Sequence, residues 1–217
     1  MVAARNSIDA SLWPDVKRVI ILYGLLLATL VPLFFLPEII SVFGMAICGL
    51  IQALIIFAVC LRIPRFFNTQ FRVDLRALQW LGIALPTTLI LLGINGLYQE
   101  LLKYFFGQGL INLEDPFKKL QYSIEFEILI TAIMPAIWEE IAFRGVIQTC
   151  LTRVIGIHQA MMVGAFLFAI LHCQFAMIPY FVFFGYTISL IRWQSGSLVP
   201  GMVLHFIHNA SVVLFMR

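Results

Sequence analysis

The stretch Trp138-Glu139-Glu140-Ile141-Ala142-Phe143-Arg144-Gly145 places two adjacent glutamates in a segment with apolar sequence on both sides. One ionisable side chain at the depth of a lipid bilayer costs roughly 2.5–3.5 kcal/mol. Such side chains persist in membrane segments when they face a cavity, pair with another charge or take part in chemistry. The stretch therefore predicts a polar cavity embedded in the membrane around Glu139 and Glu140.

The composition of the whole chain is that of an integral membrane protein. The 217 residues are 62% hydrophobic and 12% charged, with a mean hydropathy of +0.99, whereas soluble domains carry about 25% charged residues. The apolar runs are continuous rather than alternating, which favours helices over a membrane β-barrel. We predict an all-α, polytopic transmembrane helical bundle. A net charge of +3 and the lack of a suitable motif argue against a nucleic-acid partner.

The apolar runs predict about seven spans, several of them short enough to require tilting or local thinning of the bilayer. They cover residues 19–36, 39–61, 77–97, 124–144, 160–172, 178–191 and 198–215. Residues 98–122 are mixed in character and predict an interfacial helix followed by a loop. We expect residues 1–123 to form a scaffold of about three spans plus this helix, and residues 124–217 to form a catalytic domain of about four spans.

The distribution of basic residues predicts the orientation in the membrane. The loop at 62–76 holds four arginines and one aspartate, and short basic loops face the cytoplasm. Lys17 and Arg18 before the first span agree with this placement, since two spans return the chain to the same side. We expect a multi-pass protein with a cytoplasmic N-terminus, in the plasma membrane if the source is prokaryotic.

The two glutamates differ in their helical neighbours. Glu140 and Arg144 are four residues apart, so they share a helix face and can form an ion pair. Glu139 lies about 100° around the helix from Glu140 and can point into a cavity. Pro135 removes a backbone hydrogen bond one turn earlier and predicts a kink that leaves room for water. A purely structural Glu140–Arg144 pair is the alternative interpretation, and it leaves Glu139 unexplained.

Further polar side chains with helical spacing follow downstream. His172 comes four residues after Phe168, whose ring could pack on the imidazole, and His205 comes four residues before Asn209. His208 is close to His205. Taken singly, His172 is typical of a membrane interface, and a His/Asn pair is typical of hydrogen bonding between helices. Together with the glutamates, these residues have the offsets needed to face one cavity.

This set of side chains allows several chemistries. Glu and His can remove a proton from water as general bases, and His and Asn can donate hydrogen bonds to a developing oxyanion. Glu139, His172 and His205 could alternatively bind Zn²⁺, although the HExxH signature is absent. A proton- or cation-coupled transporter could also use such buried groups, but no inverted repeat is evident.

The order Glu139-Glu140-xxx-Arg144, Phe168-xxx-His172, His205-xxx-Asn209 resembles the CPBP family of intramembrane proteases. This family is related to the type II CAAX prenyl endopeptidases and is also called the Abi family. The resemblance covers about residues 125–215. It implies that Glu139 activates water with the help of His172, and that His205 and Asn209 stabilise the oxyanion. Glu140 and Arg144 match the remaining motif positions, and we expect them to shape the site.

The family has been described both as metalloproteases and as glutamate-dependent enzymes. We favour a site without a catalytic metal, because a carboxamide and an ion-paired glutamate suit water activation better than a tetrahedral zinc site. The leading hypothesis is an intramembrane endopeptidase that acts on a membrane-associated protein or peptide, with or without a lipid group. The alternative is a non-enzymatic bacteriocin-immunity or secretion-associated membrane protein.

Overall fold

The structure is a computed structural model that describes residues 10–35, 38–107 and 116–215. These ranges contain helices and no β-strand, which confirms the predicted all-α class. The α-helices are α1 (Trp13–Leu30), α2 (Glu38–Leu61), α3 (Phe66–Gln70), α4 (Leu75–Phe106), α5 (Pro116–Lys119), α6 (Ile124–Ile128), α7 (Met134–Glu139), α8 (Gln148–Ile155), α9 (Ile157–Leu171), α10 (Ile178–Ser195) and α11 (Val199–Phe215). Short 3₁₀ turns are η1 (Ala10–Leu12), η2 (Val31–Phe35) and η6 (Phe175–Met177).

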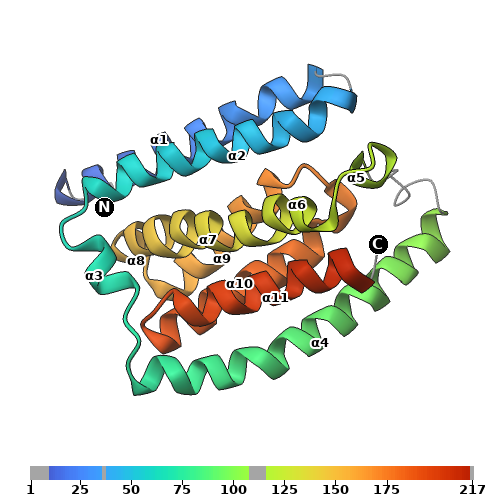
Figure 1. Ribbon diagram of the computed structural model, residues 1–217. Coiled ribbons are helices and arrows are strands. Elements are labelled where there is room, and N and C mark those ends of the chain that lie inside the picture. Colours follow the sequence, from blue (N-terminus) through green and yellow to red (C-terminus); the bar gives the residue numbers. More distant parts are fainter. Residues whose placement is uncertain (1–9, 36–37, 108–115, 216–217) are drawn as a thin grey trace, which may run out of the picture.

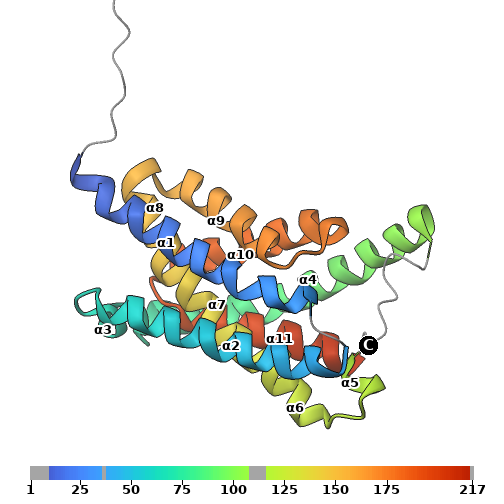
Figure 2. The ribbon, with the colours of Figure 1, turned by 90° about the horizontal axis from the view of Figure 1, so that it is seen from above.

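The helices lie roughly side by side in a bundle. Figure 1 shows α1 and α2 as an antiparallel hairpin on one side and the long helix α4 on the opposite side. The path from α6 to α8 and the helices α9, α10 and α11 lie between them, and Figure 2 shows α1 passing beside α8. The hairpin and α4 therefore flank a central group of helices that comes from the second half of the chain.

The bundle has apolar side chains outside and polar ones inside, the arrangement expected in lipid. Among the described residues, three helices are long and apolar enough to cross a membrane, at Val42–Leu61, Leu75–Phe106 and Phe175–Ser195, and α9 and α11 are shorter apolar helices. Leucines such as Leu54, Leu89 and Leu97 are more than 60% exposed, whereas the most buried side chains include charged ones. The chain is thus a membrane protein, and the number of seven spans stays a prediction.

Helix α4 differs from the sequence-based expectation. The helix predicted after residue 97 is present, but residues 98–106 continue α4 without a break instead of forming a separate element (Figure 1), and its place at the membrane interface stays a prediction. Good helix formers at Leu101, Leu102 and Lys103 favour continuation, and the Tyr98 hydroxyl anchors the segment by donating to the Ala176 carbonyl at 2.8 Å. The loop expected at 108–115 lies outside the described residues.

Residues 124–155 form one continuous helical path that alternates between two geometries. The hydroxyl of Ser123 caps its start by accepting from the Phe126 N–H at 3.3 Å. Two segments are π-helical, η4 (Leu129–Ile133) before α7 and η5 (Glu140–Ile147) after it. A π-helix closes i to i+5 rather than i to i+4 and is common at functional sites. The disturbance predicted at Pro135 therefore takes the form of a wide turn just before it.

Two tight turns set how the last helices meet. Gly156, at φ 82°, separates α8 from α9, and Gly196, at φ 69°, ends α10 with its N–H bonded to the Arg192 carbonyl at 3.1 Å. Positive φ is accessible to glycine at little cost. These turns return α9 and α11 against the path that carries the glutamates.

Candidate active site

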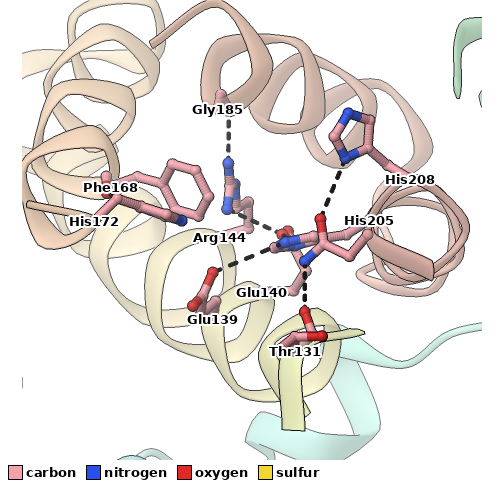
Figure 3. Close-up of polar contacts among 10 residues, drawn as sticks. Thr131, Glu139, Glu140, Arg144, Phe168, His172, Gly185, His205 and His208 are labelled. Carbon is pink, nitrogen blue, oxygen red and sulfur yellow. Dashed lines mark hydrogen bonds and ion pairs between the residues drawn. The ribbon is translucent and has the colours of Figure 1, made fainter. Parts of the chain in front are cut away.

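Glu140 is the centre of a buried polar cluster (Figure 3). Its Oε1 accepts a hydrogen bond from Nη1 of Arg144 at 3.0 Å and a second from Nδ1 of His205 at 2.8 Å. The side chains of all three residues are 1–2% exposed. The ion pair predicted from the spacing of Glu140 and Arg144 is present, and the π-helical geometry of η5 still brings the two together.

The Arg144 guanidinium has two further neighbours. Nη2 donates to the Gly185 carbonyl of α10 at 2.9 Å, and Cζ lies 4.7 Å from the centre of the Phe168 ring of α9. A cation over an aromatic face at this distance is attracted by the ring quadrupole. Arg144 therefore ties three helical elements together at the height of the glutamates.

Glu139 lies beside this cluster, and a dashed line in Figure 3 joins its carboxylate to the His205 ring. Its side chain keeps 24% exposure, and its Oε2 lies 3.9 Å from Nε2 of His205. Within the described part of the chain, this oxygen receives no hydrogen bond. Of the two adjacent carboxylates, Glu140 is therefore bonded to Arg144 and His205, whereas Glu139 has a partly exposed side chain without such bonds at Oε2.

His172 is held by two contacts that fix its ring. The Phe168 carbonyl can only accept, so Nδ1 of His172 carries a proton and donates to it at 2.8 Å. The predicted packing of Phe168 on the imidazole is present at 4.6 Å between ring centroids, and Phe181 stacks on the ring at 4.3 Å. In the neutral ring, Nε2 is then left with a lone pair that can bind a proton.

Asn209 makes a hydrogen bond that attaches α11 to η4. Its Nδ2 donates to the Thr131 carbonyl at 3.1 Å. Thr131 lies in the π-helical segment η4, one turn before Pro135, which has no N–H. The acceptor of this bond is therefore part of the wide turn just before the proline.

A cavity of about 460 Å³ gives three of the four predicted catalytic side chains a common space. Glu139, His172 and Asn209 line it, while His205 lies behind Glu139 and is 2% exposed. The opposite wall comes from the first half of the chain. It consists of Leu30, Met45, Cys48, Gly49 and Gln52. The hairpin of α1 and α2 therefore closes the cavity that the second half of the chain builds.

A comparison with known protein families matches residues 122–211 to the family described as type II CAAX prenyl endopeptidase Rce1-like. The matched segment contains all three motifs and agrees with the range predicted from the residues. Residues 122–211, called the Rce1-like domain below, are therefore similar to this family. No curated protein and no solved structure matches the chain.

The Rce1-like domain contains residues that contact the candidate site and lie outside its three motifs. Gly185 supplies the carbonyl for Arg144, Thr131 the carbonyl for Asn209, and Phe181 the ring on His172. Two of these contacts use backbone carbonyls, which carry no side-chain signal in a sequence.

The side chains proposed for zinc do not form a metal site in this arrangement. Across residues 10–35, 38–107 and 116–215, no three His, Cys, Asp or Glu side chains are grouped closely enough to hold a metal ion. Glu139 and His172 face the cavity, but His205 is buried against Glu140.

Gly201 of α11 lies where the Rce1-like domain packs closely against Glu140. A Cβ at this position would lie 2.9 Å from Cγ2 of Ile188 and 3.5 Å from Oε2 of Glu140. We expect Gly201→Val to lower the free energy of unfolding by about 1–3 kcal/mol, as overpacking does. Thermal unfolding in detergent measures this. Gly164→Ala is the control, because its Cβ meets nothing within 4 Å; equal losses in both variants would contradict the close approach.

Proposed function

We propose that this protein is an intramembrane endopeptidase that hydrolyses a peptide bond of a membrane-associated protein or peptide with water activated by Glu139 and His172. The membrane character of the chain and its Rce1-like domain support a CAAX-protease-like membrane endopeptidase. The observation that carries the proposal is the 460 Å³ cavity in which Glu139, His172 and Asn209 meet. The available carboxylate faces this cavity, while its neighbour Glu140 is engaged behind it.

The first step forms the nucleophile. The Glu139 carboxylate takes a proton from a water molecule in the cavity, and the Nε2 lone pair of His172 accepts a hydrogen bond from the same water. The water oxygen bonds to the carbonyl carbon of the substrate, and the carbonyl electrons move to its oxygen. A positioned general base contributes about 10²–10⁴-fold to such a step.

The second step stabilises the oxyanion and releases the products. Asn209 donates with the N–H that Thr131 does not use. His205 donates through Nδ1 to Glu140 and lies behind Glu139, so it supports the two glutamates from outside the cavity. The C–N bond then breaks, and the leaving amine takes the proton held by Glu139.

The test is cleavage by the purified, full-length protein in detergent micelles. The probe is a quenched fluorescent peptide that ends in a farnesylated Cys-aliphatic-aliphatic-X sequence, alongside the same peptide without the lipid. We expect a single new C-terminus by mass spectrometry, and in H₂¹⁸O we expect one ¹⁸O in its carboxylate. If neither peptide is cut, a comparison of protein termini between cells with wild type and with Glu139→Gln extends the search to natural substrates. No difference there either would contradict the proposal.

Metal dependence gives a separate prediction. We propose that the reaction needs no metal, so treatment with EDTA or 1,10-phenanthroline followed by desalting should leave the cleavage rate within about twofold, because the proposed base is a carboxylate that acts directly on water. Elemental analysis of the same active preparation measures bound zinc. One zinc per chain, together with loss of activity on its removal and recovery on its return, would overturn this prediction.

A further inference from the structure

A chain of hydrogen bonds leads from Tyr180 of α10 to the proposed oxyanion donor. The Tyr180 hydroxyl lies 2.5 Å from Nε2 of His208, and Nδ1 of His208 lies 3.2 Å from Oδ1 of Asn209. Tyr180 and His208 are 4% and 5% exposed. Neither residue belongs to the three motifs, and the proposed reaction uses neither of them directly.

The donor and acceptor of each hydrogen bond in this network follow from the Thr131 carbonyl, where the network ends. The Thr131 carbonyl can only accept, so the nitrogen of the Asn209 amide faces it and Oδ1 faces His208. An amide oxygen also only accepts, so Nδ1 of His208 must carry the proton. Nε2 of the neutral ring is then an acceptor for the Tyr180 hydroxyl, which is far closer to it than to the Leu91 carbonyl at 3.4 Å.

This network sits in the wall between two cavities. The catalytic cavity lies on one side of Asn209, and a second cavity of about 240 Å³, lined by Tyr180 and His208, lies on the other. Asn209 lines both. With Oδ1 held by His208 and one N–H held by Thr131, the amide plane is fixed, and its second N–H is the donor left for a ligand.

We infer that Tyr180 and His208 are positioning residues that orient the Asn209 amide so that its remaining N–H faces the substrate. This inference rests on the proposed function. A preorganised donor acts on charge that develops in the transition state, and losing such a donor costs about 10²–10³-fold in kcat. Loss of its support lets the amide rotate, so we expect His208→Leu to lower kcat by about 10–100-fold with little change in KM.

Two conservative variants distinguish the contact of His208 with Asn209 from its contact with Tyr180. In His208→Asn the side-chain amide can occupy the place of Nδ1 and still donate to Asn209, whereas in His208→Gln it reaches the place of Nε2 and contacts Tyr180 instead. We expect His208→Asn to keep more activity than His208→Gln, and Tyr180→Phe to lose less than His208→Leu. Tyr186→Phe on the same helix is the matched control, because within the described residues its hydroxyl makes no hydrogen bond.

A double-mutant cycle distinguishes positioning from general destabilisation. Because His208 acts only through Asn209, the variant Asn209→Ala/His208→Leu should be no slower than Asn209→Ala alone. If the two substitutions in the double variant lowered kcat multiplicatively, the inference would be overturned. Equal losses of kcat in His208→Asn and His208→Leu would overturn it as well. Melting temperatures of all variants in the same detergent control for folding.

A measurement without substrate separates this inference from the proposed function. In protein labelled with ¹⁵N-histidine, the His208 signals, assigned by their loss in His208→Leu, should report a neutral ring with the proton on Nδ1. A proton on Nε2 would overturn the hydrogen-bond network itself. Failure of the wild-type protein to cut any substrate, with the Nδ1 proton present, would instead contradict the endopeptidase proposal and leave the network standing.

Discussion

Glu139→Gln should abolish cleavage, with kcat reduced by about 10³-fold or more, while the protein still folds. Glutamine keeps the shape of the side chain but cannot take a proton from water, and this proton transfer is the step assigned to Glu139. The structure explains why folding should survive. Glu139 is 24% exposed and faces the cavity, whereas the bonds that hold the helices together belong to Glu140. Cleavage rate and melting temperature of the purified variant measure the two effects.

Two further substitutions control for charge and for side-chain length. Glu125→Gln removes an exposed carboxylate from the same helical path and should leave the rate unchanged. Glu139→Asp keeps a base but withdraws it by one methylene, so we expect a rate between those of wild type and Glu139→Gln. A Glu139→Gln protein that cuts as fast as wild type would rule out the carboxylate as base and favour the non-enzymatic role.

Arg144→Met should lower the free energy of unfolding by about 3–5 kcal/mol, because removing one partner of a buried pair leaves the other charge without compensation. The variant would leave Glu140 buried at 1% exposure and would free the Gly185 carbonyl. Arg144→Lys should lose less, since it keeps the charge but not the planar fork that reaches both acceptors. Unfolding by SDS in mixed micelles measures the differences.

The ion pair between Lys103 and Glu100 provides the matched control for this result. Its atoms are 2.7 Å apart, closer than those of the buried pair, yet Glu100 is 70% exposed. Lys103→Ala should therefore cost less than about 1 kcal/mol. In the double variant Glu140→Gln/Arg144→Met, we expect part of the stability to return because no buried charge is left alone. If Arg144→Met lowered the free energy of unfolding by less than Lys103→Ala does, the structural role of Arg144 would be contradicted.

The sequence was sufficient for those features that follow from helical spacing. Offsets of four residues predicted the Glu140–Arg144 pair and the contact of Phe168 with His172, and both are present. Apolar runs predicted the helices because backbone N–H and C=O groups in lipid must bond to one another, and a helix satisfies them within one segment. The position of Glu139 on the helix predicted that it could point into a cavity, and Glu139 lines one.

Other features depend on distances between helices, which spacing along the chain does not encode. His205 was expected in the same cavity as Glu139, His172 and Asn209, but its ring is buried against Glu140. The wall supplied by α2 and the contact of Tyr180 with His208 join residues far apart in sequence. The π-helical segments were also unforeseen, because a wide turn reflects packing around the helix rather than any residue preference.

The π-helical segment η5 makes the number of residues after Glu140 part of the architecture. A wide turn holds one residue more than a regular turn. If Glu140–Ile147 became a regular α-helix at its present length, every side chain beyond it would rotate by about 100° relative to α7. Gln148, which now donates to the Ser189 carbonyl at 3.1 Å, would then turn away from α10. The wide turn therefore keeps the residues on its two sides facing their present partners.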